Sequence, residues 1–363
     1  MKVLDYNLNY LPPFFRTFWS FNSYTQVDLN IYIISMKYFR KRIGKGFSYT
    51  DEEGSKITDE KLLSFFQSLV IPPAWTKVEI NASPRAKVRA TGFDAKGRKQ
   101  YIYNSNFRLR QEQKKFDRIL QFANQLPHMR AVTGQHLRKR KLDRNKVLAC
   151  MVRLLDVAFF RPGSDVYAKQ NKSYGLTTLR SKHLKIEADK LYFNYIGKAA
   201  QKQEKLIVDA QLAKIVRDID DLPGYEIFKF IDEEGQIQDV KSQHLNEYIR
   251  EVMGPEFSAK DFRTWAGTVI AAMSLDELGA TEKADQRKLS KNIKQAVVAV
   301  SERLGNTPAI ARKSYIDPRI IDNYTKGKTL CYFKKEVDRL LKKSENLSVE
   351  ELGVLCLLKR RLN

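Results

Sequence analysis

The sequence predicts an α+β protein, in which a small antiparallel sheet near the N-terminus precedes a mainly α-helical domain that carries a small three-stranded β element. Short runs with alternating side-chain character occur at 76–81, 87–92 and 99–103. Helical patterns dominate from residue 106 onward, and three further strand-like runs lie within 182–208. The length of 363 residues and the 43% hydrophobic content are sufficient for two domains with cores of their own.

The charge of the chain predicts a polyanionic partner. There are 65 basic and 42 acidic residues, which give a formal net charge of +23 at pH 7. This excess produces a long-range positive potential, so nucleic acid is the first expectation. The apolar runs are too short for a membrane span, and we expect no membrane partner. The three cysteines and four histidines show no metal-ligand spacing, and no phosphate-binding glycine motif occurs, so we expect no metal and no cofactor.

The first predicted sheet combines basic turns with aromatic residues. A turn at 94–97 joins its last two strands, and the residues of interest follow on the turn and on the last strand. These residues are Lys96, Arg98, Gln100, Tyr101 and Tyr103. Such a pattern fits a surface that grips a phosphate backbone. Lysines that protect a solvent-exposed sheet edge produce the same pattern.

Three basic residues of the predicted helical domain lie at distinct structural positions. An apolar helix predicted at 147–160 ends at Arg161, because a proline and a glycine follow it directly. A loop between two predicted strands presents Lys198. Arg263 lies within a helix that Ser258 can cap. Each of these residues alone also fits a purely structural role.

Tyr315 lies at the junction of two short capped helices. Gly305 suits the left-handed end of the long helix before it, and Asn306 or Thr307 can cap the next helix. Asp317 then caps another helix before a proline. The local sequence leaves two interpretations open, a core tyrosine or a nucleophile that attacks a phosphate, and core tyrosines are far more common.

Together and in this order, Arg161, Lys198, Arg263 and Tyr315 resemble the type IB DNA topoisomerases, specifically their small bacterial and poxvirus-like branch. The resemblance covers roughly residues 40–330. The segments that carry it are 71–76, 90–101, 174–179, 260–264 and 312–315.

The resemblance implies relaxation of supercoiled DNA by transient single-strand cleavage and religation, without ATP or metal, through a covalent 3′-phosphotyrosyl intermediate. It makes Tyr315 the nucleophile, assigns Arg161 and Arg263 to the phosphorane, and makes Lys198 the general acid. The chemistry is consistent with these roles. A phosphorane carries extra negative charge that a guanidinium can match, and the 5′-oxygen leaves poorly unless it is protonated.

The resemblance also implies weaker assignments. Lys260 matches a family position that assists proton transfer. Asn306 stands where the poxvirus pattern has histidine, and its amide can donate a hydrogen bond to a non-bridging oxygen but cannot carry charge. Tyr167 matches a DNA-contacting position, as do Gln100, Tyr101 and Tyr103.

We therefore expect a variable extension at 1–36, a β-rich DNA-binding domain at 37–130, a catalytic domain at 131–330 and a C-terminal helical tail at 331–363. The expected partner is double-stranded DNA, held by a monomer that closes as a clamp, in the cytoplasm if the host is a bacterium.

The main alternative is a tyrosine site-specific recombinase or integrase, which shares the Arg–Lys–Arg–Tyr order. Recombinases place a histidine three residues before the second arginine, where this chain has Lys260, and usually carry a helical N-terminal module. A non-catalytic DNA-binding protein with this fold is a second alternative, but it would have to lack at least one of the four residues.

Overall fold

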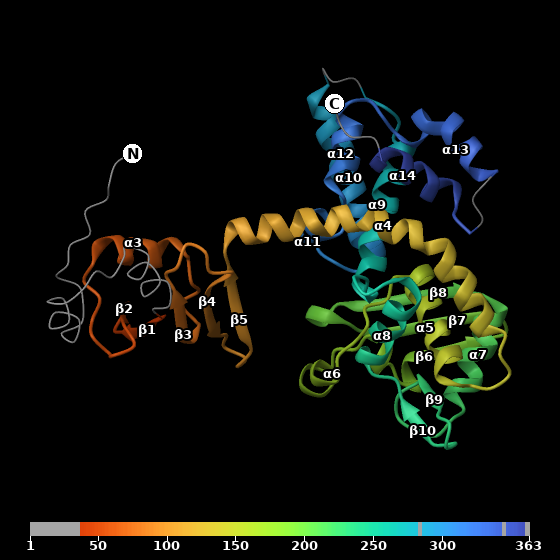
Figure 1. The fold of residues 1–363 in the computed structure, drawn as a ribbon, viewed down its shortest axis with the longest axis horizontal. Helices are drawn as coiled ribbons and strands as arrows, with labels where there is room; N and C mark the ends of the chain where they lie inside the picture. The colour runs from red at the N-terminus through yellow and green to blue at the C-terminus, as the bar shows by residue number, and fades with distance from the viewer. Residues whose placement is uncertain (1–36, 282–284, 343–345, 360–363) are drawn as a thin grey trace, which may run out of the picture. The chain divides into compact units, whose positions relative to one another are not determined.

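The computed structural model describes residues 37–281, 285–342 and 346–359, and the extension predicted at 1–36 lies outside them. Internal contacts divide the chain into two compact units, 1–114 and 115–363. Helix α4 (Ser105–Leu137) crosses the limit between these units (Figure 1). The functional domain limits expected from the sequence stay a prediction.

The first unit contains a five-stranded antiparallel sheet in the order β2-β1-β3-β4-β5, together with one helix. The elements are β1 (Lys37–Ile43), β2 (Gly46–Thr50), α3 (Glu60–Ser68), β3 (Thr76–Asn81), β4 (Val88–Phe93) and β5 (Lys99–Tyr103). Asp59 caps α3 by accepting a hydrogen bond from the backbone N–H of Leu62 at 2.8 Å. Phe66 of α3 packs with Val78 and Ile80 of β3 in a small core. The sheet confirms the strands predicted from the sequence, with β4 shifted by one residue.

Strands β1 and β2 were not predicted, because basic residues hide the alternation of β1. Tyr38 and Arg40 are both buried, while their neighbours along the strand are exposed. The guanidinium of Arg40 donates to the backbone carbonyls of Ile71, Pro72 and Trp75 at 2.9, 2.9 and 3.0 Å. A buried arginine therefore fixes the proline-containing segment that precedes β3.

The second unit is mainly helical. Its helices are α5 (Arg144–Ala158), α6 (Asp165–Asn171), α7 (Ala210–Asp220), α8 (Ser242–Met253), α9 (Ala259–Glu277), α10 (Gln286–Leu304), α11 (Pro308–Ser314), α12 (Pro318–Thr325), α13 (Lys334–Leu341) and α14 (Val349–Lys359). Single 3-10 turns are η2 (Leu176–Thr178), η3 (Ser181–His183), η4 (Lys198–Ala200) and η5 (Leu330–Phe333). None of the helices in the described stretches is long and apolar enough to span a membrane.

Two small sheets complete the second unit. The predicted three-stranded element is an antiparallel sheet in the order β6-β7-β8, with β6 (Leu184–Glu187), β7 (Lys190–Ile196) and β8 (Lys202–Val208). A separate hairpin of β9 (Lys229–Ile231) and β10 (Ile237–Asp239) was not predicted, because three-residue strands are too short to show a period.

Helix α5 lies at the centre of the second unit. Almost all of its turns are buried, and it contacts α7, α8, α9 and strand β8 (Figure 1). A helix that is buried on almost every side is typical of a core helix. Helix α14 is buried continuously over 351–358 and packs against α9, α12 and α13, so the end of the chain contributes to the same core.

Helix α4 extends beyond a residue that usually ends a helix. Helix α4 continues through Pro127 to Leu137, because its buried face continues with Met129 and Thr133 and packing outweighs the bond lost at the proline. Helix α10 begins at Gln286, where Asp285 caps it.

Candidate active site

Arg161 is held in a loop that two neighbouring segments fix. Helix α5 ends at Ala158. The next residue, Phe159, has a left-handed backbone (φ 57°, ψ 36°), and the chain then turns at Pro162 and Gly163. The carbonyls of Arg161 and Pro162 accept hydrogen bonds from the N–H groups of Leu176 (2.8 Å) and Thr177 (2.7 Å). The segment 174–179, which carried part of the resemblance, therefore holds the loop of Arg161.

Glycine is required where these two segments meet. Gly163 has φ +109°, and a Cβ atom there would lie 2.7 Å from Oγ1 of Thr177. A Cβ on Gly175 would lie 2.6 Å from the backbone nitrogen of Gly163. Larger residues would push the Arg161 loop away from its support.

Backbone carbonyls hold both arginines. Nη2 of Arg161 donates to the carbonyl of Gly305 at 2.8 Å and also to Oδ1 of Asn306. Arg263 is 2% exposed and donates through Nη1 to the carbonyl of Phe159 at 2.5 Å and through Nη2 to that of Leu304 at 2.7 Å. Within the described chain neither guanidinium forms an ion pair with a carboxylate, so both charges remain uncompensated.

The backbone around Tyr315 is fixed from two helices. Its carbonyl accepts a hydrogen bond from Oγ1 of Thr268 at 3.3 Å, and the carbonyl of Ser314 accepts one from Nζ of Lys115. Gly267 of α9 packs directly on this backbone, since a Cβ atom there would lie 2.6 Å from the carbonyl oxygen of Tyr315. Asp317 caps α12 and is fully buried. The tyrosine therefore sits at a rigid junction, as the capping pattern predicted.

Cations lower the pKa of Tyr315. Burial of the phenol raises its pKa, but the charges of Arg263, Arg161 and Lys260 outweigh this effect and leave the pKa below its ordinary value of 10. The guanidinium carbon of Arg263 lies 5.1 Å from the centre of the Tyr315 ring. Burial and the neighbouring Arg263 in turn lower the pKa of Arg161. This arrangement favours the phenolate form of Tyr315.

One cleft of the second unit brings together the residues that the sequence singled out. They are Arg161, Tyr167, Lys198, Lys260, Arg263, Asn306 and Tyr315. Lys198 is exposed on the turn between β7 and β8, and Lys260 is exposed in the first turn of α9. Segments far apart in the sequence thus bring a tyrosine, two fixed guanidinium groups and two exposed lysines to one surface.

Asn306 presents an unused donor to this cleft. Its Oδ1 accepts from Arg161, while its Nδ2 is buried and has no hydrogen-bond partner among the described residues. Nε of Arg263 is likewise buried without a hydrogen-bond partner among the described residues. A buried donor without a partner is costly, and an anionic oxygen in the cleft would satisfy it.

The predicted contact residues of the first unit form their own surface. Asp94 accepts hydrogen bonds from Nε of Arg98 at 2.8 Å and from Nε2 of Gln100 at 2.9 Å. The bond from the Arg98 side chain is the largest influence that lowers the pKa of Asp94 to about 2. Tyr101 and Tyr103 stack with ring centres 6.0 Å apart and are 47% and 44% exposed. Tyr101 and Tyr103 are therefore available for contact, whereas the side chains of Arg98 and Gln100 are hydrogen-bonded to Asp94.

Lys96 is exposed in the turn of this surface, and its backbone N–H donates to Oδ1 of Asp94 at 3.0 Å. The carboxylate therefore organises the whole turn. The side chain of Lys96 points from a fixed backbone and remains a candidate for phosphate contact.

Some residues that build the site gave no signal in the sequence. Thr268 and Gly267 are ordinary members of a helix until the fold places them under Tyr315. Gln203 likewise reads as a polar strand residue, yet it is 5% exposed and packs against Gly305. Contacts of this kind arise from tertiary packing and leave no periodic pattern.

Comparison with known proteins agrees with this geometry. Residues 104–344 match the family described as eukaryotic DNA topoisomerase I, catalytic core, and residues 46–94 match the bacterial DNA topoisomerase IB N-terminal domain. The chain is 33% identical to DNA topoisomerase 1B of Acanthamoeba polyphaga mimivirus over 284 residues, which cover 77% of this chain and 84% of the relative.

Poxvirus proteins match at lower identity. DNA topoisomerase I of Monkeypox virus and DNA topoisomerase 1B of Vaccinia virus (strain Copenhagen) are each 25% identical over 235 residues, which cover 64% of this chain and 70% of each relative. Nothing among these matches favours a recombinase. The chain belongs to the type IB DNA topoisomerase family.

Proposed function

We propose that this protein relaxes supercoiled double-stranded DNA by cutting and rejoining one strand, with Tyr315 as the nucleophile. The observation that carries the proposal is the cleft in which Tyr315 lies beside Arg161 and Arg263, neither of which forms an ion pair with a carboxylate in the described part of the chain. Their charges are available to a phosphate. DNA in turn supplies the anion that the cleft and the +23 net charge require.

In the cleavage step, the phenolic oxygen of Tyr315 attacks the phosphorus of a backbone phosphodiester and loses its proton to solvent. The bond between phosphorus and the 5′-oxygen breaks. The products are a 3′-phosphotyrosyl ester and a strand with a free 5′-hydroxyl. The reverse attack by that hydroxyl restores the phosphodiester and frees Tyr315, so the ester conserves the bond energy and ATP is not needed.

The other residues act on the charge and the protons of this step. Arg161 and Arg263 donate to the non-bridging oxygens as negative charge develops on the phosphorane. Nδ2 of Asn306 adds a neutral donor. Lys198 protonates the departing 5′-oxygen, and Lys260 assists that proton transfer. The charge stabilisation comes from side chains, so the scheme needs no metal ion.

The decisive experiment is relaxation of supercoiled plasmid in EDTA and without ATP. We expect the wild-type protein to relax the plasmid and Tyr315→Phe to be inactive, because the variant lacks the attacking oxygen. Tyr332→Phe is a matched control, since Tyr332 is 57% exposed and lies outside the cleft. Relaxation by Tyr315→Phe would disprove the nucleophile assignment. Strand exchange between two defined sites would instead support a recombinase.

The proposed partner is a DNA duplex bound by one copy of the chain. Its contact residues include Tyr167 in the cleft and the surface of the first unit described above. The closing of a clamp around the duplex and a cytoplasmic location remain predictions.

A further inference from the structure

Gln203 touches two segments that carry catalytic groups, and the mechanism above does not use it. It lies in β8 directly opposite Tyr195 of β7, and the two side chains are 5% and 4% exposed. Directly opposed residues share one face of a sheet, so Gln203 points with Tyr195 into the protein. A glutamine at such a position is unusual, because glutamine is mostly exposed.

On one side, Gln203 packs under the turn of Lys198. A Cβ atom on Gly197 would lie 3.0 Å from Cγ of Gln203. Gly197 immediately precedes Lys198, and its N–H donates to the carbonyl of Gln201 at 2.8 Å, which closes the turn. The side chain of Gln203 therefore packs against the first residue of the turn that carries Lys198.

On the other side, Gln203 packs against the segment that holds Arg161. Gly305 has φ +60°, and a Cβ atom there would lie 2.5 Å from Oε1 of Gln203 and 2.8 Å from its Cδ. The carbonyl of Gly305 accepts the hydrogen bond from Arg161, and Asn306 follows in the chain. Glycine at 305 thus lets the amide of Gln203 pack closely against this backbone.

The turn of Lys198 needs such support. Ala199 and Ala200 have φ values of 61° and 58°, in the left-handed region. Residues with a Cβ atom adopt this conformation at an energetic cost, and they keep it only where the surroundings impose it. The amide Nε2 of Gln203 donates to the carbonyl of Lys202 at 3.1 Å, which keeps the side chain folded back beside the turn.

We infer that Gln203 is a positioning residue, whose side chain fixes the turn of Lys198 against the Gly305–Asn306 segment so that the lysine ammonium meets the departing 5′-oxygen. It does not touch the reacting atoms. The inference rests on the proposed function, in which Lys198 is the proton donor. Shortening Gln203 should therefore impair the proton transfer and leave the arginine contacts in place.

The test measures single-turnover cleavage of a duplex oligonucleotide by Gln203→Ala, on two substrates. On the ordinary phosphodiester we expect a rate about 10- to 100-fold below wild type, which is the typical effect of a displaced catalytic group. On a duplex with sulfur in place of the 5′-bridging oxygen, the leaving thiolate has a conjugate acid of pKa about 8.5 and needs no donor. There we expect Gln203→Ala to approach the wild-type rate.

Three variants serve as references. Gln203→Met keeps the length and volume of the side chain and should recover most of the rate on the ordinary duplex. Glu204→Ala changes the exposed neighbour on β8 and should cut both substrates as wild type does. Lys198→Ala should cut the ordinary duplex slowly, and the 5′-sulfur substrate should restore its cleavage rate. A poorly folded variant would be slow on both substrates, so the comparison separates misfolding from mispositioning.

The outcomes distinguish this inference from the function on which it rests. If sulfur does not restore Lys198→Ala, Lys198 is not the proton donor, and the proposed function and this inference both fail at that step. If sulfur restores Lys198→Ala but not Gln203→Ala, only the inference fails, because the substitution then impairs more than the delivery of the proton. If Gln203→Ala cuts the ordinary duplex at the wild-type rate, the inference fails as well.

Discussion

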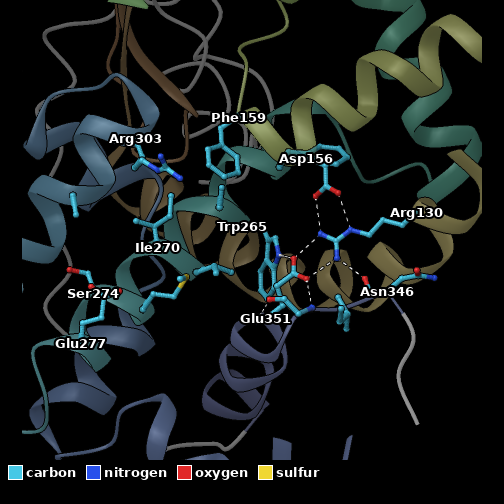
Figure 2. A pocket seen from close by; sticks show the side chains of 17 residues that line it. Arg130, Asp156, Phe159, Trp265, Ile270, Ser274, Glu277, Arg303, Asn346 and Glu351 are labelled. Atoms are coloured by element: carbon cyan, nitrogen blue, oxygen red, sulfur yellow. Dashed lines mark hydrogen bonds and ion pairs between the residues drawn. The ribbon is translucent and has the colours of Figure 1, made fainter. Parts of the chain in front are cut away.

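A buried ion cluster joins the end of the chain to the catalytic core. Figure 2 shows the guanidinium of Arg130 between the carboxylates of Asp156 and Glu351. The distances are 2.9 and 3.0 Å to Asp156, and 2.7 and 2.8 Å to Glu351. Oε1 of Glu351 also accepts from the indole N–H of Trp265 at 3.0 Å, and Oε2 accepts from the N–H of Ser348 at 2.9 Å. The carboxylate of Glu351 therefore ties helix α14 to α4 and α9, and Arg130 extends the link to Asp156 of α5.

We expect Glu351→Gln to destabilise the protein by about 3–5 kcal/mol. The substitution keeps the size of the side chain but removes its charge and turns an amide N–H₂ group toward Arg130 or Trp265. Breaking a buried ion pair on one side costs about 3–5 kcal/mol, because the remaining charge is left without compensation. Asp156 still faces Arg130, which places the expectation at the lower end of this range. Such a loss lowers the melting temperature by on the order of 10 °C.

The assay is urea unfolding followed by circular dichroism, and Glu350→Gln is the matched control. Glu350 occupies the same first turn of α14 and is partly exposed, so its substitution should change the free energy of unfolding by less than about 0.5 kcal/mol. Equal effects of the two substitutions would refute the reasoning, because the cluster would then add nothing to the stability.

The pH dependence follows from the pKa of Glu351. Burial raises this pKa, but the bonds from Arg130, Ser348 and Trp265 outweigh burial and leave it below the usual value. A carboxyl with a depressed folded-state pKa contributes stability above its unfolded-state pKa, and this contribution disappears as the pH falls through the folded-state pKa. The difference between wild type and Glu351→Gln should therefore be full at pH 7 and shrink in the acid range below the ordinary pKa of glutamate.

Two predictions concern Tyr315 directly. The single-turnover cleavage rate should rise with pH and level off below pH 10, because Arg263 and Lys260 lower the pKa of Tyr315. Lys260→Met should shift the midpoint of this pH profile upward. An unchanged midpoint would show that Lys260 does not act on the phenol. Gly267→Ala should reduce cleavage by about 100-fold, since the new Cβ would lie 2.6 Å from the carbonyl oxygen of Tyr315 and displace the proposed nucleophile. The matched control is Gly134→Ala in α4, where the nearest atom to a new Cβ is 3.9 Å away. Equal activity of the two variants in the same cleavage assay would contradict the close contact between Gly267 and Tyr315.

Local signals predicted much of the fold. The caps at Thr307 and Asp317 accept hydrogen bonds from the backbone N–H groups of their helices, and Gly305 adopts the left-handed conformation expected at the end of α10. These features depend on side chains within a few residues of one another, so a sequence pattern contains them. The three strands of the first sheet and the three-stranded element were predicted for the same reason.

Features that depend on tertiary contacts were missed. Strand β1 contains a buried arginine, which a pattern of apolar residues does not reveal, and Pro127 continues a helix that a local rule would end. In the site, the order of basic residues and Tyr315 indicated which side chains to examine. It could not indicate that Gln203 would fill the space between two glycines, because those glycines are about a hundred residues apart in the sequence.

The contacts of Asn306 suit the role proposed for it, at the position where the poxvirus pattern has histidine. The amide has an acceptor end, which holds Arg161, and a donor end, which is buried and unpartnered among the described residues. A histidine could accept from the arginine and donate to a phosphate only as the neutral ring, because the protonated ring has no acceptor. The asparagine keeps both functions at every pH. The positive charge at the cleft then comes from Arg161 and Arg263, and loss of either arginine should be more damaging than loss of the amide.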